Sequence, residues 1–174
     1  HRHGSGIGDN NARRKLKGFR MLDNLTGVMF ATLDTPSVLI DLDITERNID
    51  RFQSFANKAQ ISVRPHIKTH KLPGLAKAQI KAGAVGITCQ KISEAEVMAN
   101  AGLDDILITY NILSTSKLDR LNRLASKIKL TVVADNLTVI EGLSATFSTT
   151  APLRVLLECD TGAGRCGVQT PEAA

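Results

Sequence analysis

Residues 84–134 read AVGITCQKISEAEVMANAGLDDILITYNILSTSKLDRLNRLASKIKLTVVA. Short apolar runs alternate in this stretch with longer amphipathic segments. The runs that we expect to form strands are residues 84–89, 105–110 and 129–134. The segments that we expect to form helices are residues 93–102, which open with a Ser-Glu-Ala-Glu capping box, and residues 117–127. This alternation predicts repeated βαβ units with a parallel sheet.

The same alternation continues on both sides of this stretch. Further strands are expected at residues 37–42, 61–67 and 153–160. Further helices are expected from residue 43, from residue 73 to Gly83, and at residues 137–145. Strand and helix recur at a spacing of roughly 20–25 residues, which is typical of the α/β class. Both a doubly wound sheet and a β/α barrel consist of such units, so the alternation leaves these two architectures open.

The composition indicates a globular protein and argues against nucleic-acid binding. Apolar residues make up 43% of the chain and charged residues 22%. Aromatic residues make up only 3%, which leaves few rings on which bases could stack. The net charge of +5 arises within the first 20 residues, because the remainder holds 16 basic and 16 acidic residues. We therefore expect neither a nucleic-acid nor a membrane partner.

Residues 1–30 are interpreted as a basic tail that is disordered or not native to the protein. The chain begins with His, and apolar periodicity starts only near Met21. Met21 and Met29 are both plausible native starts, and a transit peptide is the weaker interpretation. We find no secretory leader and no apolar run near the ~20 residues of a membrane span. The odd number of cysteines (Cys89, Cys159 and Cys166) then predicts reduced thiols in a cytoplasmic protein.

The segment at residues 64–71, Arg-Pro-His-Ile-Lys-Thr-His-Lys, is the most informative for function. In an extended chain alternate side chains share a face, so Arg64, His66 and Lys68 would point the same way. A polar row on a buried strand is costly unless it faces a ligand, as at the carboxyl end of a barrel strand. The amine of Lys68, activated by desolvation or nearby cations, would suit covalent chemistry with a carbonyl group. A basic surface loop after a strand is the other interpretation.

Polar residues also follow the other predicted strands where each strand ends. They are Thr88, Gln90, Tyr110, Asn111, Asp135, Asn136 and Asp160. The carboxyl ends of parallel strands meet at one edge, where β/α proteins build their sites. Each residue alone is also an ordinary loop or helix-cap residue. Their repetition after successive strands is what predicts a site.

Residues 162–167, Gly-Ala-Gly-Arg-Cys-Gly, match the dinucleotide-binding pattern G-x-G-x-x-G. That pattern normally follows the first strand of its fold, whereas about five βα elements precede it here. We therefore interpret the segment as a glycine-rich loop that lets the backbone approach a ligand, with Arg165 as its polar contact. A surface salt bridge is the alternative role of Arg165.

Four ordered motifs resemble one known family. They are residues 33–36 (LDTP), 64–71 (RPHIKTHK), 86–96 (GITCQKISEAE) and 158–168 (ECDTGAGRCGV). Together they look like the D-threonine aldolase and D-serine dehydratase family, which are pyridoxal-phosphate enzymes of the alanine-racemase (type III) fold. The resemblance implies that residues 31–174 are the N-terminal part of a (β/α)8 TIM barrel, with about five of its eight strands. The predicted strand at residues 37–42 would belong to the separate β-domain of these enzymes.

The resemblance also implies roles for four residues. Lys68 would carry pyridoxal 5'-phosphate covalently and be the catalytic lysine. Arg165 would lie near the phenolic oxygen of the cofactor, and His66 and Gln90 would line the cofactor cavity. The divalent-metal ligands of this family (for Mn, Mg or Zn) lie near its carboxyl terminus, so we predict no metal ligand among these 174 residues.

The expected activity is that of a lyase acting on D-3-hydroxy amino acids. The residues of the motifs at 86–96 and 158–168 favour a D-threonine aldolase, which yields glycine and acetaldehyde. The alternatives are a D-serine or 3-hydroxy-D-aspartate dehydratase, an alanine-racemase-like racemase or pyridoxal-phosphate carrier, and a non-enzymatic module that binds a phosphorylated ligand. We expect a D-amino acid as the small-molecule partner, a homodimer for the full-length protein, and no turnover by this chain alone.

Overall fold

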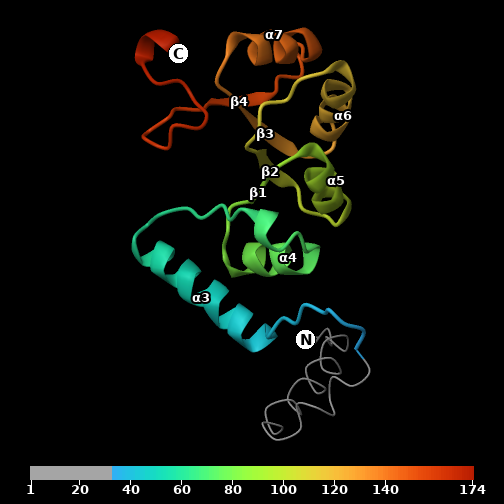
Figure 1. Cartoon of the computed structure of the whole chain (residues 1–174), viewed down its shortest axis with the longest axis vertical. Coiled ribbons are helices and arrows are strands. Elements are labelled where there is room, and N and C mark those ends of the chain that lie inside the picture. Colours follow the sequence, from blue (N-terminus) through green and yellow to red (C-terminus); the bar gives the residue numbers. More distant parts are fainter. Residues whose placement is uncertain (1–32) are drawn as a thin grey trace, which may run out of the picture. The chain divides into compact units, whose positions relative to one another are not determined.

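Figure 1 shows a computed structural model of the chain, in which residues 33–174 are described. The chain divides into two compact units, His1–Ile40 and Asp41–Ala174. Within the first unit, residues 33–40 form neither a helix nor a strand and include a cis peptide bond between Thr35 and Pro36. The basic tail predicted at residues 1–30 lies outside the described residues.

The second unit is built around a parallel sheet. Its strands are β1 (Ile87–Cys89), β2 (Asp105–Ile108), β3 (Lys129–Ala134) and β4 (Arg154–Leu157). They lie in the order β1-β2-β3-β4, and all three neighbouring pairs are parallel. A doubly wound sheet reverses its strand order at a switch point, whereas this order follows the sequence without reversal. The structure therefore confirms the predicted α/β class and has the strand order of a barrel segment.

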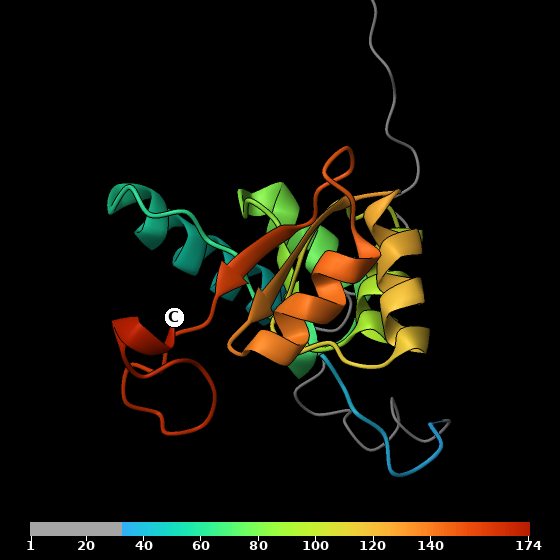
Figure 2. The ribbon, with the colours of Figure 1, turned by 90° about the horizontal axis from the view of Figure 1, so that it is seen from above.

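Helices connect the strands and cover one face of the sheet (Figure 2). They are α4 (Pro73–Ala82), α5 (Ile92–Asn100), α6 (Thr115–Ala125) and α7 (Leu137–Thr146). Helix α3 (Leu42–Lys58) precedes all four strands and packs against α4, and η2 (Ile67–Thr69) and η3 (Pro171–Ala173) are 3-10 turns. Pro73 fits the first turn of α4 because its missing N–H has no helical partner there. Gly83 ends α4 with a φ of 125°, which an L side chain rarely adopts. No helix within residues 33–174 is both long and apolar enough to cross a bilayer.

The core lies between the sheet and helices α4 to α7. It contains strand residues such as Ile87, Ile106 and Val132 together with helix residues such as Met98 and Leu121. Burying one such aliphatic side chain stabilises the fold by about 1.5–3 kcal/mol. Strand β4 differs, because all four of its residues are exposed and no described strand pairs with its outer edge.

Two predicted strands are wrong. Residues 37–42 form no strand, since α3 begins at Leu42 and its first turn is capped by Asp41, whose carboxylate accepts the Ile44 N–H at 2.9 Å. An apolar run cannot by itself specify a partner strand. Within the described residues, no strand pairs with residues 37–42. The helix predicted from residue 43 therefore begins one residue earlier, at Leu42.

The second wrong strand is residues 61–67, which are extended beside β1 without forming a regular ladder. The N–H groups of Val85 and Thr88 donate to the carbonyls of Val63 and Pro65 at 2.9 and 2.8 Å. Pro65 has no N–H to return, and a single bridge joins His66 to Thr88 before the chain turns into η2. The described residues thus hold four strands and one extended segment instead of the expected five barrel strands.

Candidate functional site

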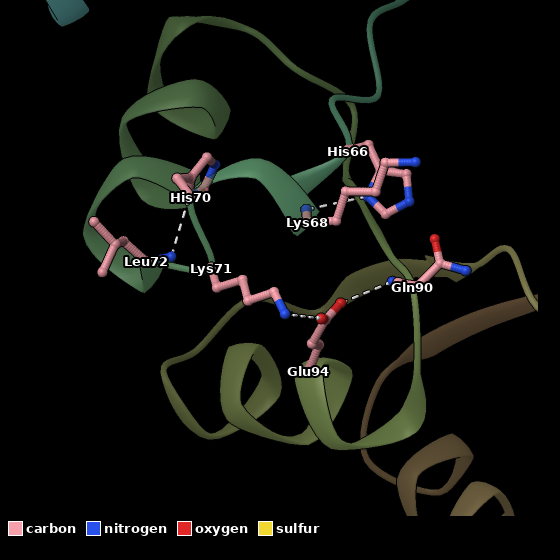
Figure 3. A network of polar contacts seen from close by, with 7 residues as sticks. All are labelled: His66, Lys68, His70, Lys71, Leu72, Gln90 and Glu94. Carbon is pink, nitrogen blue, oxygen red and sulfur yellow. Dashed lines mark hydrogen bonds and ion pairs between the residues drawn. The ribbon is translucent and has the colours of Figure 1, made fainter.

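Lys68 lies in the 3-10 turn η2, next to the carboxyl end of β1 (Figure 3). The turn is anchored by Ile67, which is fully buried and whose carbonyl accepts the N–H groups of His70 and Lys71. The Lys68 N–H donates to Nδ1 of His66 at 3.2 Å, and the Lys68 side chain is exposed. The predicted alternation of side chains therefore ends at Ile67, because a turn and not a strand carries Lys68.

The His66 imidazole lies between Lys68 and the ends of β1 and β2. Burial lowers the pKa of His66, and the positive charge of Lys68 lowers it further, while a hydrogen bond between the imidazole and the Gln90 side chain opposes the shift. The Nε2 atom lies 3.5 Å from the hydroxyl of Thr109. The structure thus brings His66, Lys68 and Gln90 together, with a neutral imidazole at pH 7.

Glu94, which the sequence analysis did not propose as a site residue, is a buried carboxylate next to these three residues. Glu94 is 8% exposed, and its oxygens accept the Gln90 N–H at 2.9 Å and pair with Nζ of Lys71 at 3.1 Å. Burial opposes the ionisation of Glu94, but the Gln90 N–H and Lys71 outweigh it and lower the pKa. The predicted capping box contained Glu94, yet its cap at Ser93 is wrong, because Lys91 precedes the first turn of α5 and makes no side-chain cap.

A second polar cluster joins the ends of β2, β3 and β4. One oxygen of Asp135 accepts hydrogen bonds from the side-chain amides of Asn111 and Asn136, at 2.6 and 2.8 Å. The other oxygen accepts the N–H of Gly167 at 2.8 Å. The Gly167 N–H is the main cause of a lowered pKa at Asp135, followed by the Asn136 amide. The expected convergence of polar residues at the strand ends is therefore present in this cluster.

The glycine-rich loop after β4 is held by its own carboxylate. Asp160 accepts the N–H groups of Gly162 and Gly164 at 2.9 and 3.0 Å. Gly167 has a φ of 101°, and a Cβ atom there would lie 2.5 Å from the backbone nitrogen of Asp160. The loop carries Arg165 as an exposed side chain that pairs with no carboxylate between residues 33 and 174.

The two clusters remain separate in this structure. No hydrogen bond or ion pair among the described residues joins Arg165 to the cluster of Lys68, His66 and Gln90. A cavity of about 370 Å³ opens beside Gln90, Tyr110 and Asn111, and neither Lys68 nor Arg165 lines it. Within residues 33–174, no three His, Cys, Asp or Glu side chains gather in a group that could hold a metal ion.

Strands in sequence order, connecting helices on one face and polar groups at the carboxyl ends define a β/α protein, a class that places its ligand sites at that edge. The family described as the alanine racemase N-terminal domain matches residues 40–174. The chain belongs to this family, and the resemblance and the barrel-type fold predicted from the motifs are confirmed.

Lyases are among the relatives of this chain. A D-threonine aldolase from an Arthrobacter species is 41% identical over 143 residues, which are 82% of this chain and 38% of that protein. A D-threo-3-hydroxyaspartate dehydratase from Delftia is 35% identical over 138 residues, covering 79% of this chain and 36% of that protein. The crystal structure of D-threonine aldolase from Filomicrobium marinum superposes with a TM-score of 0.77 at 39% identity, over 80% of this chain and 38% of that one. The chain thus spans little more than a third of the length of each of these proteins.

Proposed function

We propose that residues 31–174 are the part of a pyridoxal-phosphate-dependent lyase that carries the cofactor lysine, Lys68. The observation that supports this most is the position of Lys68, on an exposed turn beside a neutral imidazole at the carboxyl edge of the sheet. An amine at such an edge can meet an aldehyde without the chain having to unfold. When bound, pyridoxal phosphate supplies the electron sink that allows a bond to the α-carbon of an amino acid to break.

The residues present fit this cofactor by their chemistry. An aldehyde requires an accessible amine, which Lys68 offers, and anionic oxygens require cationic donors, for which the unpaired exposed guanidinium of Arg165 is available in the described part of the chain. The neutral ring of His66 and the amide of Gln90 offer an apolar face and hydrogen bonds beside Lys68. We assign Lys68 as the covalent attachment point, and His66, Gln90 and Arg165 as cofactor-binding residues.

For the whole protein we propose cleavage of D-threonine to glycine and acetaldehyde. The D-threonine aldolase relative supports this substrate, and the Delftia relative supports dehydration of a 3-hydroxy-D-aspartate as the second candidate. Expression of the complete coding sequence and analysis of products distinguishes the two. Acetaldehyde and glycine support the aldolase, whereas ammonia and a 2-oxo acid support the dehydratase. A divalent metal, a homodimer and a cytoplasmic location are further parts of this proposal.

The cofactor assignment is tested on the 174-residue chain. The chain is incubated with pyridoxal phosphate, reduced with borohydride and mapped by peptide mass spectrometry. We expect a phosphopyridoxyl adduct concentrated on Lys68, and its loss in Lys68→Met but not in Lys77→Met, a matched change of an exposed lysine in α4. Adducts spread evenly over exposed lysines would contradict the assignment and favour a non-enzymatic binding module.

The chain alone is expected to show no turnover of D-threonine. Strand β4 exposes Val155, Leu156 and Leu157, and no described strand covers its outer edge. A barrel with an open edge does not enclose the substrate. Measurable release of acetaldehyde by the purified 174-residue chain would contradict this part of the proposal.

A further inference from the structure

We propose that Glu94 is a positioning residue for Lys68, acting as a buried carboxylate that ties the Lys68 turn to the turn after β1. This inference rests on the proposed function, since it takes Lys68 as the cofactor lysine. Glu94 is not proposed to touch the cofactor or the substrate. It acts through Lys71 and Gln90, which it binds from below the turn (Figure 3).

The two oxygens of Glu94 serve two different segments. Oε2 accepts the backbone N–H of Gln90 at 2.9 Å, which fixes the turn between β1 and α5. Oε1 lies 3.1 Å from Nζ of Lys71, which belongs to the segment that carries Lys68. Because Glu94 is 8% exposed, this ion pair is less screened than one on the surface. One side chain thus joins segments that are about 20 residues apart in the sequence.

The backbone around Lys68 explains how the ion pair between Glu94 and Lys71 can affect the position of Lys68. Lys71 has a φ of 55°, in the left-handed region, so the chain reverses there. The carbonyl of Ile67 accepts the N–H of Lys71 at 2.7 Å, and the Ile67 side chain is fully buried. Lys68 therefore lies in a short loop held at one end by apolar burial and at the other by the ion pair with Glu94. Without the ion pair, the second end keeps its backbone hydrogen bonds and the hydrogen bond from the Leu72 N–H to Nδ1 of His70, and none of these ties it to the turn after β1.

An ordinary helix-capping role for Glu94 makes a different prediction. Glu94 occupies the third position of α5, where a side-chain oxygen commonly accepts a backbone N–H that precedes the helix. Glutamine also supplies such an oxygen, so Glu94→Gln would leave a capping role largely intact. The same change removes the charge that binds Lys71. The variant therefore separates capping from positioning.

The experiment measures cofactor capture by the 174-residue chain at limiting pyridoxal phosphate, as the ratio of reduced adduct on Lys68 to that on Lys81. We expect Glu94→Gln and Lys71→Met each to lower this ratio by about tenfold, the size of a lost charge-assisted hydrogen bond. The double variant should lose no more than either single change, because both remove one interaction. Lys71→Arg should restore most of the ratio, and Lys77→Met should leave it unchanged. The induced circular dichroism of the bound cofactor should fall with the ratio.

The outcomes separate this inference from the proposed function. If wild-type chain forms no preferential adduct on Lys68, the proposed function and this inference both fail. If wild-type chain labels Lys68 but Lys71→Met matches it in ratio and circular dichroism, only the positioning role fails. Additive losses in the double variant would also overturn it. Lys71 has a side chain that is 57% exposed, so Lys71→Met keeps the test valid even if Glu94→Gln does not fold.

Discussion

The carboxylate of Asp135 accepts the backbone N–H of Gly167 at 2.8 Å, across 32 residues of sequence. The same carboxylate binds the amide of Asn111, which lies 24 residues before it. Asn111, Asp135 and Gly167 follow β2, β3 and β4. Parallel strands that run in sequence order bring their carboxyl ends to one edge, which makes this contact possible. Asp135 thus sets the position of the loop that carries Arg165.

We predict that Asp135→Asn destabilises the chain by about 1–3 kcal/mol, the cost of leaving buried or half-buried donors without an acceptor. An asparagine offers a single acceptor oxygen, whereas Asp135 uses both oxygens to bind three donors. Urea denaturation followed by circular dichroism measures the change. The control is Asp119→Asn on the exposed face of α6, which should change the unfolding free energy by less than about 0.5 kcal/mol. Equal effects of the two substitutions would contradict the role of Asp135.

We predict graded costs for alanine at three glycines. Gly167→Ala combines a positive φ with a Cβ clash against Asp160 and should cost more than about 2 kcal/mol. Gly162→Ala has a φ of 125° but open space around the Cβ position, so it should cost only about 1 kcal/mol. Gly74→Ala, in the first turn of α4 with open space, should be neutral or slightly stabilising. Thermal unfolding of the three variants tests this order, and a reversal of the first and third would contradict it.

We predict that the chain loses stability as the pH falls from 7.5 to 5.5. Burial is the main cause of a lowered pKa at both His66 and His70. Their ordinary pKa is 6.5, so below this pH the unfolded chain binds more protons than the folded chain, and stability falls with pH. At pH 7.5 and above both states hold mostly neutral rings, and the curve should be nearly flat.

The double variant His66→Asn, His70→Asn tests this assignment of the pH dependence. Asparagine keeps an acceptor for the N–H groups of Lys68 and Leu72, which the two histidines bind through Nδ1. Urea denaturation at pH 7.5 and 5.5 should show a smaller loss of stability in the variant than in wild type. Glu94 and Asp135, with lowered pKa values, lose their contribution only below their ordinary values of 4.5 and 3.8. An unchanged loss between pH 7.5 and 5.5 would assign the dependence to other groups.

We predict that Cys89 resists alkylation while Cys159 and Cys166 react. Cys89 is fully buried in β1, and burial raises the pKa of its thiol to about 12, with a further contribution from Glu94. Cys159 is exposed and Cys166 is half-buried. Treatment with iodoacetamide at pH 8 and peptide mapping should show labelling of Cys89 at least about tenfold slower than of Cys159. All three should react in urea. Rapid labelling of Cys89 in the folded chain would contradict its burial.

Much of the fold was predictable because its elements are local. The strand predicted at residues 129–134 has the observed bounds, and α4 ends at the predicted glycine, since both signals lie within a few residues. The sequence did not reveal that residues 61–67 form an irregular extended segment instead of a strand, although it contains Pro65. Whether a proline interrupts pairing depends on which neighbour its missing N–H would have faced. The strand predicted at residues 37–42 was also wrong because pairing depends on the neighbouring segment, and an apolar run does not identify that neighbour.

The candidate site was predictable in its chemistry more than in its geometry. The motif at residues 64–71 singled out His66 and Lys68, and the structure brings both beside Gln90. The pairing of Glu94 with Lys71 was missed, because Glu94 also fits a helix cap and Lys71 was considered only as a cation near Lys68. Long-range partners of charged groups follow from packing, and no pattern within one segment specifies them.

Local patterns in the chain were sufficient to predict its α/β fold class, the parallel direction of its strands and the polar residue types at the strand ends. Hydrophobic periodicity, caps and glycines act over a few residues, so they can be recognised in one segment without knowing which other segment it packs against. The turn under Lys68, the ion pair that holds it and the link from Asp135 to Gly167 arose only when distant segments packed together. Contacts between residues tens of positions apart depend on the three-dimensional path of the whole chain, which local patterns do not encode.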